Sequence, residues 1–240
     1  MERSHEEHMI ADNISAVMKN IEKACAKAGR DPDSVSLIAV SKTKPVEMLR
    51  EAYDAGMRDF GENKVQEILD KMPQLPSDIR WHMIGHLQRN KVKYLIGRVA
   101  MIHSVDSVAL AEQIEKESAK RGKVTDILLE VNAARETSKW GFAPENVLDA
   151  AREISALSHV RIRGLMTSAP LTDHPESNRP YFRQLRELLE TLGASGYPHV
   201  KADTLSMGMT CDFEIAVEEG ATIVRLGTVI FGRREPLGLR

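Results

Sequence analysis

Lys42 is the first residue whose surroundings suggest chemistry. It follows the apolar run 37–40 (LIAV) after a single serine. An amine at the end of a buried strand loses part of its hydration, which weakens its preference for the charged form and allows it to act as a Schiff-base nucleophile. An ordinary strand-end lysine that reaches water or a carboxylate is the alternative, and the position alone does not separate the two.

Arg225 places a permanent charge in an apolar segment. It interrupts a run of large apolar side chains, namely Ile223, Val224, Leu226, Val229, Ile230 and Phe231. A buried guanidinium is costly unless it is paired. Arg225 is therefore predicted either to contact a ligand or to form a buried ion pair with Glu62 or Glu130 at another strand end. A guanidinium close to Lys42 would also lower the pKa of that amine.

Two short segments could bind an anion. Residues 206–210 (SMGMT) lead from a predicted strand directly into a predicted helix, and Gly227 and Thr228 lie within the last predicted strand. The free N–H groups at a helix N-terminus can bind a phosphate. The alternative is structural: Ser206, Thr210 or Asp212 only caps the helix, and Gly227 relieves crowding.

The elements that position these residues alternate in type along the chain. Short β-rich runs are followed by stretches with apolar residues at helical spacing, which is the pattern of a parallel sheet. A helix predicted over 12–28 precedes them, and another helix is predicted around 92–96. The predicted strands are 36–42, 59–63, 81–85, 101–106, 126–132, 162–168, 204–208 and 223–232.

Eight β/α units in 240 residues predict a TIM (β/α)8 barrel with an additional N-terminal helix. An open doubly wound sheet is the alternative, but it favours a glycine-rich turn after the first strand, and the segment 36–45 (SLIAVSKTKP) contains no glycine. Active sites of barrels lie at the carboxyl ends of the strands, where Lys42 and residues 206–210 are predicted. We expect a flexible tail over 1–11 and a single domain over 12–240.

The composition excludes several classes of partner. The 33 Lys and Arg residues against 35 Asp and Glu residues give a net charge of −2, which provides no positive field for nucleic acid or an anionic membrane. No apolar run exceeds four residues, whereas a membrane-spanning helix needs about 20. The two cysteines, Cys25 and Cys211, form no CxxC motif and no disulfide framework. We expect a cytoplasmic protein.

The three chemical features together match one cofactor. Pyridoxal 5'-phosphate (PLP) needs an amine for its aldehyde, a partner for its pyridine nitrogen and a clamp for its phosphate. The sequence also resembles the pyridoxal phosphate homeostasis protein family, which is similar to the N-terminal barrel of alanine racemases, and the resemblance extends over nearly the whole chain. The runs that carry it are AVSKTKP (39–45), FGENKVQE (60–67), WHMIGHLQRNK (81–91), RGLMTSAPL (163–171), LSMGMTCDFEIAVEEGAT (205–222) and VRLGTVIFG (224–232).

The resemblance implies a role for each matched position. Lys42 forms the Schiff base that attaches PLP covalently, and Arg225 faces the pyridine nitrogen. The residues that bind the phosphate, together with nearby N–H groups, are Ser206, Gly208, Gly227 and Thr228. The residues that line the ring are Asn63, Met166 and His86.

The chain departs from the family pattern at the rim of the predicted pocket. Segment 132–142 resembles the family's NxxxExSKxGF motif, but it carries Ala133-Ala134-Arg135 and a bulky Trp140 where small or polar residues are usual. Ser168 replaces a residue that is commonly apolar. We expect these differences to leave the cofactor roles intact.

Two further clusters have simpler interpretations. His82 and His86 are four residues apart, but a strand end that contains Gly85 lacks the one-face geometry of a helical zinc motif, and we predict no metal site. The basic side chains of segment 89–98 are predicted to form one solvated helix face.

The same site could serve a carrier or an enzyme, and two features favour the carrier. An arginine leaves the pyridine nitrogen unprotonated, which makes the ring a poorer electron sink. Racemisation also needs a second acid/base on the opposite face of the substrate carbon. The four tyrosines fall outside the matched motifs, and the chain has no equivalent of the β domain through which alanine racemases receive a base from a partner subunit.

We therefore predict a PLP-binding protein without catalytic residues or substantial turnover. It would act in intracellular PLP homeostasis by storing, buffering or delivering the cofactor, with apo forms of PLP enzymes as recipients. We expect a monomer or a weak homodimer. A short PLP-dependent amino-acid racemase is the alternative.

Overall fold

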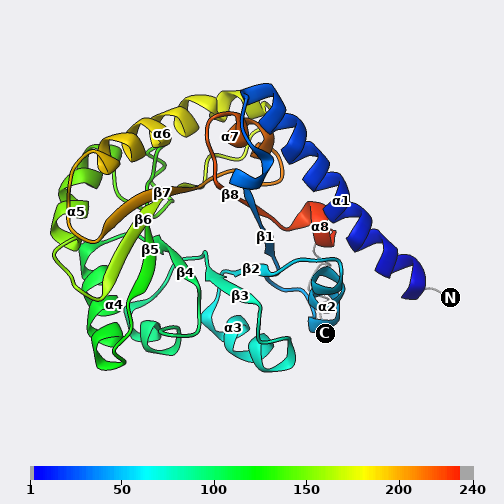
Figure 1. Cartoon of the computed structure of the whole chain (residues 1–240), viewed down its shortest axis with the longest axis horizontal. Coiled ribbons are helices and arrows are strands. Elements are labelled where there is room, and N and C mark those ends of the chain that lie inside the picture. The colour runs from blue at the N-terminus through cyan, green and yellow to red at the C-terminus, as the bar shows by residue number, and fades with distance from the viewer. Residues whose placement is uncertain (1–2, 233–240) are drawn as a thin grey trace.

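The chain folds into a closed barrel of eight parallel strands, ordered β1 to β8 around the ring as along the sequence (Figure 1). The computed structural model describes residues 3–232. β1 and β8 pair in parallel and close the ring, with Ile38 aligned to Arg225. The predicted TIM barrel is confirmed. The strands are β1 (Ser36–Val40), β2 (Asp59–Glu62), β3 (Arg80–Met83), β4 (Met101–Val105), β5 (Thr125–Glu130), β6 (Val160–Met166), β7 (Val200–Ser206) and β8 (Ile223–Leu226).

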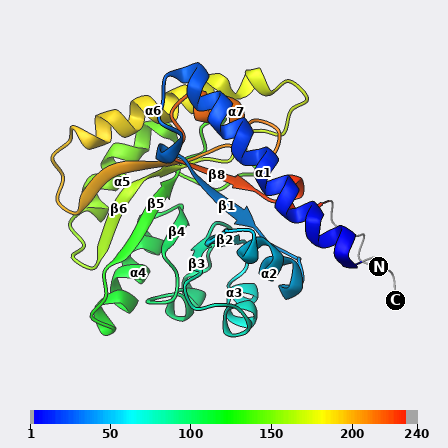
Figure 2. The ribbon, with the colours of Figure 1, turned by 45° about the vertical axis from the view of Figure 1, so that its right-hand side comes forward.

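Helices surround the barrel, and the additional helix α1 crosses its outside against α2, α7 and α8 (Figure 2). The α-helices are α1 (Arg3–Ala28), α2 (Val46–Asp54), α3 (Val65–Lys71), α4 (Val108–Lys120), α5 (Val147–Ile154), α6 (Arg179–Gly193), α7 (Phe213–Glu218) and α8 (Thr228–Phe231). The 3-10 helices are η1 (Pro32–Ser34), η2 (Met72–Gln74), η3 (Arg89–Tyr94), η4 (Pro144–Asn146) and η5 (Pro175–Asn178). Residues 1–2 of the predicted tail and residues 233–240 of the predicted domain lie outside the described residues.

The N-terminal helix is longer than predicted. α1 begins at Arg3, so most of the segment 1–11 that we expected to be a flexible tail is helical. Ile10 is 1% exposed and extends the buried stripe of Ile14 and Val17 at the spacing of one helix face. The predicted start of the helix at residue 12 was wrong, because the polar composition of the preceding segment did not reveal that Ile10 continues the buried face.

The last strand is shorter than predicted. β8 ends at Leu226 and α8 follows, whereas we predicted a strand up to residue 232. A short apolar run fits a strand or a buried helical turn equally well. Here the contact with α1 stabilises the turn, since Asn13 Nδ2 donates to Ile230 O at 3.0 Å. The helix predicted around 92–96 is likewise replaced by the 3-10 helix η3.

Side chains alternate between the barrel interior and the layer under the helices. In β3, Trp81 and Met83 belong to the main apolar core, whereas His82 between them bonds to His103 of β4 inside the barrel. A small separate apolar cluster consists of Met101, Leu128 and Met166. The main core therefore lies between strands and helices, and the barrel interior mixes polar and apolar groups.

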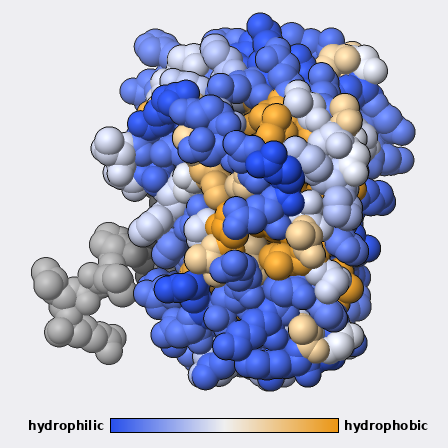
Figure 3. All heavy atoms as spheres, turned by 90° about the vertical axis from the view of Figure 1, so that its left-hand side faces the viewer, coloured by the Kyte–Doolittle hydropathy of each residue, from blue (hydrophilic) through white to orange (hydrophobic). Residues whose placement is uncertain are grey.

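The face of the molecule seen in Figure 3 is mostly hydrophilic. Figure 3 views the side on which α5 and α6 lie in Figure 1, and apolar side chains are confined there to a band between polar ones. Among residues 3–232, no helix combines the length and the apolar character needed to cross a membrane.

Candidate functional site

Lys42 lies at the carboxyl end of β1, in a tight turn that Lys44 N closes by donating to Ser41 O at 3.0 Å. Lys42 is half-buried. Thr43 has a φ of 64°, in the left-handed region that residues other than glycine seldom adopt. The main chain beside the candidate amine is thus held in a sparsely populated conformation, which is a recurrent feature of functional sites.

The residue before Lys42 is anchored by a buried ion pair. Ser41 Oγ donates to Glu62 Oε1 at 2.7 Å. Lys71 Nζ donates to the same oxygen at 2.7 Å and to Ser41 O at 2.8 Å. Glu62 is fully buried, and burial raises its pKa to about 7 against the opposing effect of Lys71. Its second oxygen, Oε2, has no hydrogen-bond partner among the described residues.

The residue after Lys42 is anchored by the same lysine. Thr43 N donates to Glu67 Oε2 at 2.7 Å, and Lys71 Nζ donates to that oxygen at 2.8 Å. One ammonium group thus joins the two carboxylates that hold both neighbours of Lys42. We refer to Glu62, Glu67 and Lys71 as the Lys71 bridge. Sequence analysis missed it, although the four-residue spacing within α3 permits the ion pair between Glu67 and Lys71.

Arg225 is 5% exposed and points into the barrel. Its Nη1 donates to Ser206 Oγ at 2.6 Å, and its Nη2 donates to Thr167 O at 2.8 Å and to Ser168 Oγ at 3.4 Å. All three acceptors are neutral. Burial lowers the pKa of Arg225 to about 10, so the guanidinium keeps its charge at neutral pH.

The two carboxylates considered as ion-pair partners do not bond to Arg225. Glu62 faces α3 on the outside of the barrel, where it pairs with Lys71. Burial and the charge of Asp106 raise the pKa of Glu130 to about 7, although the positive charges of Arg225 and Lys139 act against them. No described carboxylate forms an ion pair with Arg225, so that alternative is wrong for the described residues, and the hydrogen-bond acceptors of this buried cation are all neutral.

Ser206 is fully buried at the end of β7. Its Oγ accepts from Arg225 and lies 2.9 Å from His103 Nδ1. The contacts continue from His103 Nε2 to His82 Nδ1 at 3.0 Å, and from His82 Nε2 to Asp59 Oδ1 at 3.0 Å. We refer to these five residues as the interior chain. Sequence analysis missed the role of His103, although the two-residue alternation along β4 places it inside the barrel.

The loop after β7 lies against strand β8 at the predicted phosphate site, since Arg225 N donates to Gly208 O at 3.1 Å. Gly208 has a φ of +94°, and a Cβ there would lie 2.7 Å from the Cβ of Ala216. A Cβ at Gly227 would lie 2.9 Å from Val40 O. Both glycines are therefore required by close packing, which confirms the predicted relief of crowding at Gly227.

N–H groups at the ends of these loops are available to a ligand. Those of Thr210, Thr228 and Val229 donate to no backbone acceptor among the described residues, and the Thr228 side chain is exposed. Asp212 occupies the N-cap position of α7, but its carboxylate accepts from Met209 N at 2.7 Å instead of capping the helix. The geometry suits an anion bound at the barrel mouth.

The predicted ring contacts lie on neighbouring parts of the rim and interior. Asn63 is half-buried after β2, and a Cβ on Gly85 would lie 2.5 Å from Asn63 O, so the loops after β2 and β3 touch. Met166 is 1% exposed and is aligned with Ser206 of the next strand.

Trp140 has a structural partner at the rim. Its ring stacks on His86, with 3.9 Å between centroids and 14° between planes. His86 Nδ1 also lies 3.0 Å from Asp106 Oδ2. His82, by contrast, bonds inside the barrel, so the two histidines share no partner. The other departure, Ser168, contacts Arg225 directly and thus reaches the site instead of only its rim.

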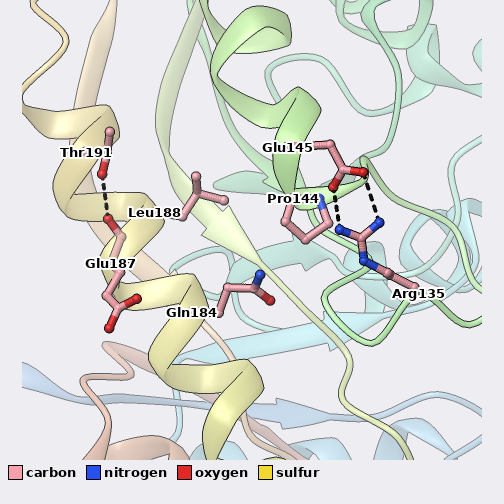
Figure 4. A pocket seen from close by; sticks show the side chains of 7 residues that line it. All are labelled: Arg135, Pro144, Glu145, Gln184, Glu187, Leu188 and Thr191. Carbon is pink, nitrogen blue, oxygen red and sulfur yellow. Dashed lines mark hydrogen bonds and ion pairs between the residues drawn. The ribbon is translucent and has the colours of Figure 1, made fainter.

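A groove of about 400 Å³ lies away from these residues, on the outside of the barrel. Figure 4 shows Arg135 and Glu145 joined by two hydrogen bonds on one wall and side chains of α6 on the other. The lining residues are Arg135, Pro144, Glu145, Gln184, Glu187, Leu188 and Thr191. None of them is a predicted cofactor-binding residue, so this groove is separate from the candidate site.

The fold and the arrangement at the barrel mouth define a class of protein. The family described as "Alanine racemase, N-terminal domain" matches residues 13–235. An alanine racemase of Clostridium difficile 630 shares the fold with a TM-score of 0.72 and 14% identity, over 94% of this chain and 58% of the racemase. The protein is a barrel of the alanine racemase N-terminal class.

Relatives of similar length specify the family. A protein of Aquifex aeolicus named "Pyridoxal phosphate homeostasis protein" is 47% identical over 228 residues, which are 93% of this chain and 98% of the relative. The structure of PipY from Synechococcus elongatus PCC7942, solved with PLP bound, matches with a TM-score of 0.80 and 37% identity, over 93% of this chain and 100% of PipY. The chain belongs to the pyridoxal phosphate homeostasis protein family, as the sequence resemblance indicated.

Proposed function

We propose that this protein binds PLP at the carboxyl end of the barrel through a Schiff base with Lys42. It acts in intracellular PLP homeostasis by storing, buffering or delivering the cofactor, without substantial turnover. Two comparisons support this: the curated relatives carry the homeostasis name, and PipY was solved with PLP bound.

The residues of this chain fit the chemical groups of PLP. The buried Arg225 has only neutral acceptors, so a pyridine nitrogen would give it a further acceptor without adding a buried charge pair. The N–H groups of Thr210, Thr228 and Val229 suit a phosphate. Close packing at Gly208 and Gly227 brings the backbone of both loops within reach of such a group.

Each residue has a defined task in this proposal. PLP supplies an aldehyde that condenses with the Nζ of Lys42 and releases water. Arg225 orients the ring by donating to its pyridine nitrogen, and Asn63 and Met166 line the ring. The phosphate is bound by Ser206, Gly208, Gly227 and Thr228 with the neighbouring N–H groups.

The observation that carries the proposal is the anchoring of both neighbours of Lys42 by the Lys71 bridge. Borohydride reduction of the PLP-loaded protein followed by peptide mapping should locate the adduct at Lys42. Lys42→Ala should abolish the adduct and keep the fold, whereas Lys64→Ala, at an exposed lysine, should leave the adduct unchanged. A main adduct at Lys44 or Lys139 would show that a different amine reacts.

A short amino-acid racemase is the second candidate, and Glu130 is the observation that favours it. A carboxyl with a pKa of about 7 can accept or donate a proton at neutral pH, and it could complement Lys42 as a second base. Solvent-deuterium exchange at the α-carbon of alanine separates the two functions. A carrier should exchange at about the rate of free PLP and should transfer PLP to an apo-enzyme, whereas turnover on the order of 1 s⁻¹ that is lost in Glu130→Gln would establish the racemase.

A further inference from the structure

The interior chain runs through the barrel from one end to the other. It starts at Arg225, near the predicted cofactor site, and ends at Asp59, the first residue of β2 at the amino end of the barrel. We propose that His103 and His82 are positioning residues that hold the Arg225 guanidinium in one orientation through a hydrogen-bond chain of fixed direction. The proposal rests on the proposed function, in which Arg225 contacts the pyridine nitrogen of PLP.

At each end of the interior chain, the residue can act only as a hydrogen-bond donor or only as an acceptor. A guanidinium has donors and no acceptor, so Arg225 donates to Ser206 Oγ. At the other end, burial acts to raise the pKa of Asp59, but hydrogen bonds from His82 and Arg80 lower it to about 2. Asp59 is therefore a carboxylate that only accepts, and His82 Nε2 carries the proton that it receives.

The direction of the hydrogen bonds in the middle of the interior chain follows from the burial of His103. This side chain is fully buried, and burial lowers the pKa of His103 well below its ordinary value. A neutral imidazole carries one proton. If that proton is on Nε2, then Ser206 Oγ donates to Nδ1, His103 donates to His82 Nδ1, and every contact has one donor and one acceptor.

The opposite direction conflicts with two observations. A proton on His103 Nδ1 would require His82 to be protonated on both nitrogens, which would place a positive charge 3.0 Å from the fully buried ring of His103. It would also leave the Ser206 hydroxyl proton without an acceptor among the described residues. An unsatisfied buried hydroxyl costs free energy, so the direction from Arg225 to Asp59 is favoured.

The fixed direction has a consequence for Arg225. Its Nη1 is held by a hydroxyl whose own proton is committed to His103, and its Nη2 is held by Thr167 O at 2.8 Å. Two points fix the plane of the guanidinium. The remaining donors then keep one orientation toward the barrel mouth, so a bound pyridine nitrogen meets a preorganised partner.

The direction of the hydrogen bonds along the interior chain can be measured without PLP. Nitrogen-15 NMR of histidine-labelled apo-protein, assigned with single histidine variants, should show His82 and His103 as neutral imidazoles protonated on Nε2 at pH 7. An Nδ1-protonated His103, or a doubly protonated His82, would overturn the proposed direction.

The effect on the cofactor is measured by PLP titration. His103→Phe keeps an aromatic ring at this position but removes both hydrogen bonds, and it should weaken PLP binding about ten- to a hundred-fold and shift the absorbance maximum of the bound cofactor. His103→Gln can still accept and donate, and it should recover part of the affinity. Ser104→Ala changes the neighbouring buried side chain, whose Oγ has no hydrogen-bond partner in the described range 3–232, and should bind PLP like the wild type.

A variant near the barrel surface guards against a folding defect. Asp59→Asn keeps the shape of the last acceptor and removes its charge, so it should weaken PLP binding in the same direction by about two- to ten-fold. Folded His103→Phe and Asp59→Asn proteins with wild-type affinity and absorbance would overturn the positioning role. A wild-type protein that binds no PLP would instead contradict the proposed function, and the NMR result would still decide the direction of the chain.

Discussion

The two cationic residues of the candidate site are supported in opposite ways. Around Lys42, charged groups hold the main chain: the Lys71 bridge lies outside the strands and anchors the residues before and after the lysine. Around Arg225, neutral groups hold the side chain itself, and the carboxylate that ends the interior chain lies at the far side of the barrel.

The difference corresponds to what each residue has to do. An amine that forms and releases a covalent bond must change its protonation state, so a carboxylate bonded directly to it would oppose the reaction by stabilising the ammonium. The Lys71 bridge acts on the main chain on both sides of Lys42, so it can position this residue through its backbone. A guanidinium stays charged throughout, and its orientation can be fixed directly by hydrogen bonds. The ionic support is therefore expected to contribute more to stability, and the neutral support more to ligand binding.

Lys71→Met tests the ionic support and should have the largest effect on stability. It removes the ammonium from between two carboxylates, one of them fully buried, and should lower the free energy of unfolding by about 3–5 kcal/mol. Urea unfolding at pH 7 measures the change, and the rate of borohydride-trapped adduct formation at Lys42 should fall as well. Lys64→Met, at an exposed position before α3, is the control. Equal midpoints for the two variants would show that the bridge is dispensable.

Arg225→Met tests the neutral support, and it should lower PLP affinity more than it lowers the free energy of unfolding. The substitution leaves Ser206 and Thr167 O without a donor, but it also removes a charge from a buried site, so the free energy of unfolding should fall by at most about 2 kcal/mol. PLP affinity should fall much further than stability. Parallel urea unfolding and PLP titration measure both quantities. A loss of stability as large as that of Lys71→Met would contradict the contrast between the two supports.

Glu130→Gln tests the raised pKa on which the second candidate function depends. The pKa of Glu130 is raised to about 7 in the folded protein, from 4.5 in the absence of the fold. The folded state therefore holds a proton that the unfolded state has released, and the stability present below pH 4.5 is lost as the pH rises to about 7, by about 3 kcal/mol.

Urea unfolding at pH 5 and pH 8 measures this loss. Glu130→Gln should reduce the difference between the two pH values, whereas Glu153→Gln, at an exposed position on α5, should preserve it. Glu62 contributes in the same direction, since its pKa is also raised to about 7, so part of the difference should remain. An unchanged pH dependence in Glu130→Gln would remove the basis for its proposed role as a second base.

The barrel could be predicted from the sequence because the patterns that indicate it lie within short segments of the chain. Each strand and helix repeats its own apolar spacing, and eight such units suffice to identify the fold. Lys42 and Arg225 were found in the same way, since a charged residue that ends or interrupts an apolar run is visible without a structure. The predicted end of β8 was wrong because it depends on a contact between distant parts of the chain, from Asn13 to Ile230, that local patterns do not contain.

The supports of the two residues were missed for a related reason. Lys71 follows Glu62 by nine positions, and His103 precedes Ser206 by 103 positions, so nothing in the spacing indicates that these side chains bond. Glu62 was instead considered as a partner of Arg225. Only the pleat of β2 decides that its carboxylate faces α3 while Asp59 and Gly61 face the interior. Pairings of this kind require the register of the closed barrel.

Trp140→Ala should have the smallest effect, because the Trp140–His86 stack belongs to neither support. The side chain of Trp140 is 58% exposed, and loss of one aromatic contact at the rim should lower the free energy of unfolding by about 0.5–1 kcal/mol, with little change in PLP affinity. A double-mutant cycle with His86→Ala isolates the contact, since the two single effects should not add. If Trp140→Ala weakened PLP binding as strongly as Arg225→Met, the rim would be a third support of the site, and the contrast between one ionic and one neutral support would be incomplete.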